Sequence, residues 1–173
     1  LINGLNNFTK NGGSIAIFPP KEIDLTSYNN TLRQLRIATF SELKTQSVLL
    51  ENINIKHSIY KQVFEGKLDK INFPEIKKYY PIISVNNSNS VALLTQENKA
   101  DFLSVFSKEK GLIYLFNSPL DIKFNNFSKH ALFVPTLMNI ATSSIRTESI
   151  YNTISAEDYF SSNAIKNSNA LVH

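Results

Sequence analysis

The chain alternates between segments with a helical apolar stripe and short, continuously apolar runs, a pattern typical of a mixed α/β protein. A first helix is predicted over residues 1–10, whose apolar stripe consists of Ile2, Leu5 and Phe8. We expect it to end at the glycine pair 12–13, because glycine after a last turn accepts a positive φ. The apolar run at 14–18 predicts a strand covered on both faces, as in one half of a doubly wound parallel sheet.

Two more helices are predicted in the first half of the chain. Residues 27–36 place apolar side chains on one helical face, and Ser27 is the expected N-cap of that helix. Residues 55–65 also have helical spacing, and Gly66 follows them as a helix-ending residue.

Strands are predicted around these helices and after them. Residues 39–54 show a diffuse β-like pattern, and prolines interrupt 71–85, which limits any strands there to short or edge positions. Three apolar runs then predict an antiparallel meander, at 91–95, 102–106 and 112–116.

The last helix is predicted over 128–143, a segment that is apolar nearly all round. Pro135 lies inside it, so either the proline kinks the helix, or the helix begins there and 130–134 lead into it. The chain is polar beyond this helix. We therefore expect one α/β domain at 1–145, followed at 146–173 by a polar tail or the start of another region.

The amino-acid composition limits the kinds of catalytic, metal and nucleic-acid-binding site that the chain can form. The chain has no cysteine, which excludes disulfides, thiolate nucleophiles and cysteine-based metal sites. Its three histidines are far apart and show no metal-ligand spacing, so we predict neither a metal nor another cofactor. The net charge of +4 comes from lysines that are scattered along the sequence, which favours a solvated basic face over nucleic-acid binding.

The segment YLFNSPLDIKFNNFSKHALFVP, residues 114–135, carries the candidate chemistry. Ser118, His130 and Asp121 are the residue types of a nucleophile, its base and the acid that orients the base. Ser118 lacks the flanking glycines of a nucleophile elbow, however. The structural alternative is a Ser-Pro turn in which Asp121 satisfies loop amides and His130 lies on the first turn of the following helix.

A small-ligand site is a third interpretation of the same segment. Ligands of open α/β sheets bind outside the carboxyl ends of the strands. Residues 19–24 and 117–126 follow two predicted strands, so they would line such a crevice. The candidate binding residues are Asn117, Ser118, Asp121, Asn126 and His130.

Several phrases occur in an order that resembles a known family. They are LINGLNNFTKNGGSIAIFPP, SYNNTL, INIKHSIYKQVFEG, INFPEIKKYY, KGLIYLFNSPLD and NNFSKHALFVPTLMNIA, which together cover roughly residues 1–145. The chain resembles the soluble region of BatA-type, aerotolerance-regulator-like membrane proteins of Bacteroidetes. The resemblance implies a flavodoxin-like or class I glutamine amidotransferase-like three-layer sandwich with a β-meander insertion, and it implies that further strands of the domain precede residue 1.

The resemblance also implies a location and a role. Members of the family carry transmembrane helices, so this chain is expected to belong to a membrane-anchored protein on the periplasmic side of the inner membrane. True amidotransferases use a cysteine nucleophile, which this chain lacks, so no catalytic residue is carried over. The leading interpretation is therefore a non-catalytic interaction or scaffolding domain whose partners are other cell-envelope proteins. Ligand sensing ranks second, and a hydrolase using Ser118, His130 and Asp121 ranks third.

Overall fold

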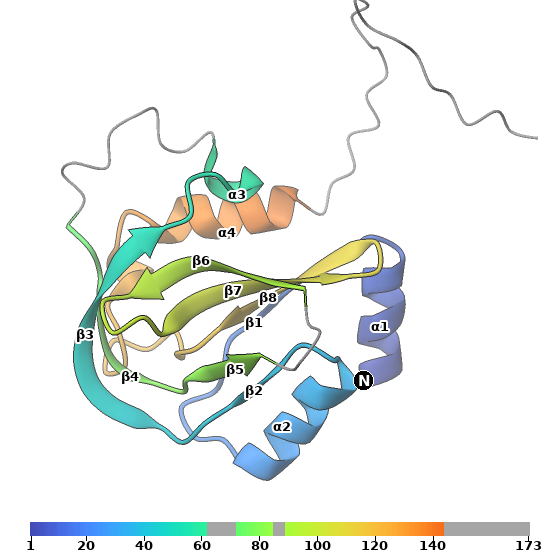
Figure 1. The fold of residues 1–173 in the computed structure, drawn as a ribbon, viewed down its shortest axis with the longest axis horizontal. Helices are drawn as coiled ribbons and strands as arrows, with labels where there is room; N and C mark the ends of the chain where they lie inside the picture. The colour runs from blue at the N-terminus through green and yellow to red at the C-terminus, as the bar shows by residue number, and fades with distance from the viewer. Residues whose placement is uncertain (62–71, 85–88, 144–173) are drawn as a thin grey trace, which may run out of the picture.

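The fold is built on a six-stranded sheet with helices against both faces (Figure 1). The computed structural model describes residues 1–61, 72–84 and 89–143. The strand order is β1-β8-β7-β6-β3-β4, and two further strands, β2 and β5, pair with each other. The strands are β1 (Ser14–Ile17), β2 (Ala38–Phe40), β3 (Lys44–Ile53), β4 (Glu75–Tyr79), β5 (Ile82–Ser84), β6 (Ser90–Gln96), β7 (Asp101–Lys108) and β8 (Gly111–Phe116). The helices are α1 (Ile2–Lys10), α2 (Leu25–Gln34), α3 (Ser58–Lys61) and α4 (Phe133–Thr142), with a 3-10 turn at Phe127–Lys129.

The predicted meander is confirmed. β6, β7 and β8 are consecutive antiparallel neighbours, and β7 pairs with β8 without interruption from Leu103↔Phe116 to Lys108↔Gly111. The apolar run at 14–18 also forms the predicted parallel strand, because β1 pairs with β8 in parallel. The expectation that both of its faces are covered was wrong, since β1 lies at the edge of the sheet and Ala16 is exposed. The expectation of a doubly wound parallel sheet was wrong beyond that pair, since the other four pairings of this sheet are antiparallel.

Each face of the sheet has its own hydrophobic core. One core contains Tyr114 and Phe116 of β8 and is covered by α3 and α4. The other contains Ile113 and Leu115 of the same strand and is covered by α1, α2 and the β2–β5 ribbon. Successive side chains of a strand point to opposite faces, so β8, buried on both, reads in the sequence as a continuous apolar run.

The ends of α1 and α2 show the same backbone motif with different residues. After α1, the Gly13 and Gly12 amides donate to the carbonyls of Phe8 and Thr9, and Gly12 has φ 92°, as predicted for the glycine pair. The predicted start of α2 was wrong: the helix begins at Leu25, and Asp24 caps it by accepting a hydrogen bond from the Ser27 amide. The acidic N-cap satisfies a free first-turn amide, and the helix starts three residues earlier than it would with Ser27 as its cap.

The end of α2 is also earlier than predicted. Its C-cap is Leu35, and Arg36 follows with φ 57°. The Arg36 amide donates to the Arg33 carbonyl, and the Ile37 amide donates to the Leu32 carbonyl. This is the Schellman pattern, with an arginine at the left-handed position that glycine usually occupies.

Two other helices are shorter than predicted. The helix expected at 128–143 begins only at Phe133, so Pro135 lies within its first turn, where the missing N–H costs no intrahelical bond. The helix expected at 55–65 is α3, which covers Ser58–Lys61 in the described part, and the rest of that prediction falls outside the described residues. The predicted tail at 146–173 lies outside them as well.

No helix in the described ranges is both long and apolar enough to cross a bilayer.

The β7–β8 turn is packed against the end of α1 through Gly111, and this generates a stability prediction. A Cβ added to Gly111 would lie 2.3 Å from the Gly13 carbonyl oxygen and 2.6 Å from the Thr9 carbonyl oxygen. Backbone atoms cannot move aside as a side chain can, so Gly111→Ala should lower the free energy of unfolding by about 1–3 kcal/mol. Urea denaturation measures this.

The matched control is Gly4→Ala in α1, where nothing lies within 4 Å of the added Cβ. Alanine is the better helix former, so this variant should gain about 0.5–1 kcal/mol. Equal effects of the two substitutions would contradict the close packing of the turn.

Candidate functional site

Ser118 is a buried structural residue in this protein. Its hydroxyl donates to the Lys78 carbonyl at 2.8 Å and accepts a hydrogen bond from Asn125 Nδ2 at 2.8 Å. Asn125 is fully buried, and its Nδ2 also donates to the Pro119 carbonyl at 2.7 Å. The Phe127 amide donates to Asn125 Oδ1 at 3.1 Å. The hydroxyl therefore joins the end of β4 to the turn after β8.

Asn117 is the first residue after β8 and is also fully buried. Its Nδ2 donates to the Asp101 carbonyl at 2.7 Å, and its own carbonyl accepts from the Tyr80 amide at 2.7 Å. Its Oδ1 is buried without a hydrogen-bond partner. Buried polar atoms are usually paired, so this oxygen is an exception at the carboxyl end of the strand.

Asp121 holds two loops together at the edge where β1 and β8 end. Its carboxylate forms an ion pair of 2.5 Å with Lys21 and accepts a hydrogen bond of 2.8 Å from the Lys123 amide. The hydrogen bond from Lys21, followed by that from the amide, holds the pKa of the Asp121 carboxyl below its ordinary value. The Tyr80 hydroxyl donates to the Lys21 carbonyl at 2.9 Å. The segments 19–24 and 117–126 are thus brought together, as predicted.

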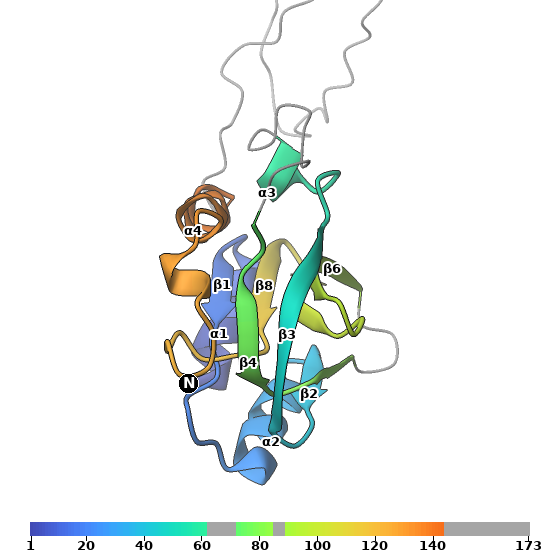
Figure 2. The ribbon, with the colours of Figure 1, turned by 90° about the vertical axis from the view of Figure 1, so that its left-hand side faces the viewer.

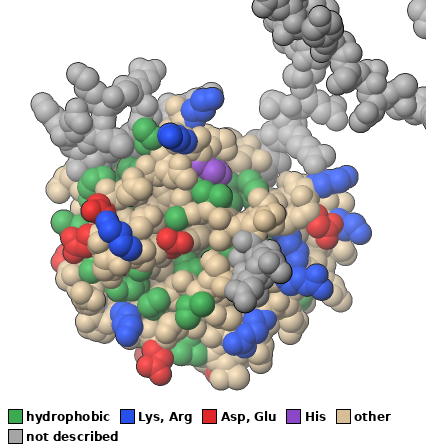
Figure 3. All heavy atoms as spheres, in the orientation of Figure 1, with side chains coloured by type: hydrophobic (Ala, Val, Ile, Leu, Met, Phe, Trp, Pro, Cys, Tyr) green, Lys and Arg blue, Asp and Glu red, His purple; other side chains and the backbone are tan. Residues whose placement is uncertain are grey.

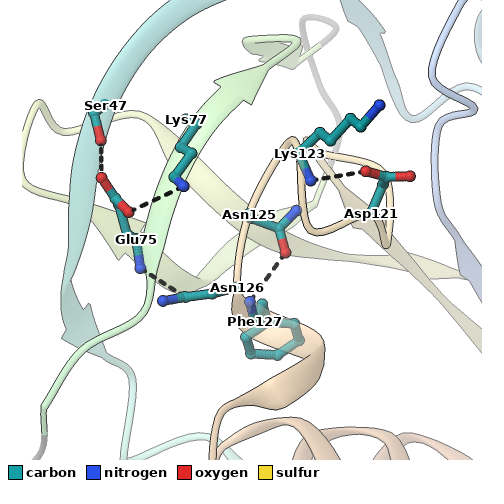
Figure 4. Close-up of polar contacts among 8 residues, drawn as sticks. All are labelled: Ser47, Glu75, Lys77, Asp121, Lys123, Asn125, Asn126 and Phe127. Carbon is teal, nitrogen blue, oxygen red and sulfur yellow. Dashed lines mark hydrogen bonds and ion pairs between the residues drawn. The ribbon is translucent and has the colours of Figure 1, made fainter.

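Asn126 connects the same segment to the start of β4 (Figure 4). The Glu75 amide donates to Asn126 Oδ1 at 2.8 Å, and the Asn126 amide donates to the Glu75 carbonyl at 3.2 Å. The Glu75 carboxylate faces the other way, toward Ser47 of β3 and, at 3.7 Å, the Lys77 ammonium. Its charge is therefore directed along the strands and away from the loop.

His130 uses both ring nitrogens on the backbone. The Leu132 amide donates to Nδ1 at 3.1 Å, and Nε2 contacts the Asn72 carbonyl. Because Nδ1 accepts, the ring is in the tautomer whose Nε2–H donates to that carbonyl. His130 precedes α4 and does not lie on its first turn, so that part of the structural alternative was wrong.

These contacts make the segment after β8 an additional partner of β4. The amides of Lys77 and Lys78 both donate to the Phe124 carbonyl, and Ile76 and Asn125 form an antiparallel bridge. Figure 2, which faces β3 and β4, shows the segment running beside β4 on the side away from β3. An edge strand with unpaired backbone groups is thereby covered.

The structure does not assemble Ser118, His130 and Asp121 into a hydrogen-bonded triad. Among the hydrogen bonds of the described residues, Ser118 is joined to β4 and Asn125, His130 to Asn72 and Leu132, and Asp121 to lysine groups. The interpretation of 118–121 as a turn in which Asp121 satisfies a loop amide is confirmed. A ligand-binding role for the five candidate residues stays a prediction.

Sequence reasoning missed Asn125 and Lys21, which carry much of this arrangement. Asn125 stands beside Asn126 in an Asn-Asn-Phe sequence, and no pattern tells which amide is buried. Lys21 is distant in sequence from Asp121 and becomes its partner only through the parallel β1–β8 pair. No three His, Asp or Glu side chains of the described ranges come close enough to hold a metal ion.

Comparisons with known proteins bear on the fold alone. No protein-family model matches the chain, and no curated protein matches it. The cytoplasmic protein STM3548 from Salmonella typhimurium superposes with a TM-score of 0.62 at 15% identity, over 82% of this chain and 58% of that one. The cytoplasmic protein STM1381 from Salmonella typhimurium LT2 gives 0.62 at 16% identity, over 82% and 59%. The chain thus spans less than two thirds of either protein, and both likenesses show a shared α/β fold.

The burial of Asn125 predicts that it matters more for stability than any exposed asparagine. Asn125→Ala should lower the free energy of unfolding by about 3 kcal/mol, because three hydrogen bonds are lost and their buried partners stay unpaired. Ser118→Ala, which removes the bond donated to Lys78 and the bond accepted from Asn125, should cost about 2 kcal/mol. The exposed control Asn3→Ala should change stability by less than about 0.5 kcal/mol in the same denaturant titrations.

Proposed function

We propose that this chain is a non-catalytic interaction domain of a membrane-anchored cell-envelope protein of the BatA type. The observation that carries the proposal is the engagement of the candidate catalytic side chains in structural contacts. The Ser118 hydroxyl and both ring nitrogens of His130 are hydrogen-bonded to backbone or amide groups. A nucleophile and its base would need those atoms directed at each other and at a substrate.

The amidotransferase-like architecture belongs to the same proposal. It is supported by helices on both faces of the sheet and by the parallel β1–β8 pair. The antiparallel strands β6 and β7 would then be the meander inserted in such a fold. The missing cysteine removes the nucleophile of an active amidotransferase from this chain.

The proposed partners are other proteins of the cell envelope, met on the periplasmic side of the inner membrane. Anchoring would be supplied by segments outside this chain. The outer face of α4 supports a protein partner: Val134 is 58% exposed and Met138 is 61% exposed, and the helix carries no charged residue. Adjacent exposed apolar side chains on one helix face are a feature of protein-binding surfaces.

Site-specific photocrosslinking in the full-length, membrane-anchored protein tests this proposal. A photoreactive residue at Met138 should yield a discrete adduct with another envelope protein. The same residue at Thr45, an exposed position at the start of β3, should yield none. Met138→Glu with the probe at Val134 should abolish the adduct, because a charge would be buried at the contact. Absence of an adduct at α4, or equal adducts at both positions, would refute the interaction role assigned to this face.

A small ligand at the carboxyl ends of β1 and β8 is the second candidate function. The observation that favours it is Asn117 Oδ1, a buried acceptor without a partner, near the loops joined by Lys21 and Asp121. A polar ligand that donates a hydrogen bond would satisfy that oxygen.

Thermal-shift screening with small polar metabolites tests this second candidate. A true ligand should raise the unfolding midpoint of the wild-type chain but not that of Asp121→Asn. Glu97→Gln, which makes the same change of charge at an exposed position, should keep the response. A panel without hits, or hits that are indifferent to Asp121→Asn, would argue against a site here.

A further inference from the structure

The tertiary structure brings together basic side chains that are scattered in the sequence. They come from the end of α1, the end of α2 and the β7–β8 turn, and we call this group the basic end: Lys10, Arg33, Arg36, Lys108 and Lys110. Lys108 Nζ donates to the Leu35 carbonyl at 3.0 Å, which joins the turn to α2. Gly111 lies against the backbone of Thr9 and Gly13, which joins the turn to α1. Figure 3 shows Lys and Arg side chains gathered on the side where Figure 1 has α1 and this turn.

The basic end concentrates the charge of the protein. The β7–β8 turn adds one acidic residue, Glu109, to this surface. With five cations and one carboxylate, the basic end has a net charge of +4, which equals the net charge of the whole chain. The ion pairs found in the described ranges involve Lys21, Lys77 and Lys99, all of them elsewhere. The basic residues are scattered along the sequence, and the fold gathers these five on one part of the surface.

Helix capping explains only part of this arrangement. Cations near helix C-termini are favoured by the helix dipole, and Lys108 satisfies a free carbonyl there. Arg36, however, occupies the left-handed position of its Schellman motif, where α1 has Gly12. A non-glycine residue is strained at that position. Capping α2 does not require the charge of an arginine, although the left-handed backbone by itself does not single out Arg36, since Lys99 and Glu109 also have positive φ.

The chemistry of the basic end selects the kind of partner. Two helix C-termini present carbonyls and no free amides, so this surface lacks the N–H cradle that holds a single phosphate at a helix N-terminus. The groups that reach outward are the ends of long cationic side chains. Such separate charges fit a planar array of anionic groups better than they fit one bound phosphate. Phe8 is 51% exposed and lies beside Gly13 after the end of α1, and thus adds an exposed aromatic ring near this turn. Aromatic rings beside clustered cations are typical of surfaces that bind anionic lipid headgroups.

We propose that the basic end binds the surface of an anionic phospholipid bilayer, with Lys10, Arg36 and Lys110 facing the headgroups and Phe8 at the interface. This contact is made by the chain itself and is independent of the membrane anchor in the proposed function. The isolated 173-residue chain should therefore show it.

Vesicle flotation of the isolated chain tests the proposal. The chain should bind vesicles of phosphatidylcholine with one-third phosphatidylglycerol, and should not bind vesicles of phosphatidylcholine alone. Binding should be lost in high salt, because screening shortens the reach of these charges. The triple variant Lys10→Gln/Arg36→Gly/Lys110→Gln should partition on the order of a hundred-fold more weakly, about five-fold for each cation removed.

The matched control is Lys44→Gln/Lys56→Gln/Lys129→Gln, which removes the same charge at exposed positions outside the basic end. It should keep most of the binding. Arg36→Gly alone should bind more weakly while its unfolding midpoint stays at or above that of the wild type, because glycine relieves the strained position. Loss of binding that goes with unfolding would contradict this separation of effects.

Several outcomes would overturn the proposal. They are no binding to the anionic vesicles, equal loss in both triple variants, and binding to duplex DNA or polyglutamate without binding to vesicles.

Discussion

The fold depends on the hydrogen bonds that fasten the segment after β8 to β4. In strand order β4 lies at one edge of the sheet and β8 next to the other, with three strands between them. The Asn117 carbonyl nevertheless accepts a hydrogen bond from the Tyr80 amide, and the Phe124 carbonyl accepts hydrogen bonds from the amides of Lys77 and Lys78. The sheet therefore curls until its far edge meets the continuation of β8. The buried side chains of Ser118 and Asn125 fix this junction: the Ser118 hydroxyl donates across it to the Lys78 carbonyl of β4, and Asn125 holds the segment after β8 in shape through Ser118 and Pro119.

This constraint also decides what the polar residues do. A serine, an aspartate and a histidine within thirteen residues suggest a catalytic site in the sequence. A junction of two irregular segments needs such polar side chains as well. Backbone amides and carbonyls outside a regular ladder must find partners, and short polar side chains are the ones that reach them. The same residues also position Asp121 beside Lys21, where the charged pair ties the β1 and β8 loops together.

The surface is organised differently from this junction. A net positive charge of +4 lies at the amino end of β8, where two helices finish and a tight turn packs against one of them, whereas the candidate polar residues lie at the other end of that strand. α1 and α2 finish with the same Schellman pattern, one with glycine and one with arginine at the left-handed position. The motif after α1 thus has the residue that a left-handed backbone favours, whereas the motif after α2 has a charged side chain on the surface.

The sequence by itself determined the features that are local. The position of α1, its glycine cap, the meander and the buried character of β8 could all be predicted, because each depends on residues within a few turns or one strand length. The burial of β1 and of Phe8 could not, because β1 became an edge strand and Phe8 is 51% exposed. The extent of β3 could not, since its side chains are mostly exposed and two bulges interrupt its alternation. The start of α2 depended on which of two nearby capping residues the chain uses.

Only the tertiary structure decided which distant segments meet. It placed Lys21 beside Asp121, chose Asn125 over Asn126 for burial and gathered five cations from three elements into one surface. The physical reason is that strand order and packing are set by burying both faces of the sheet at once. This burial depends on apolar side chains from the whole chain, so no short stretch of sequence shows it as a periodic pattern.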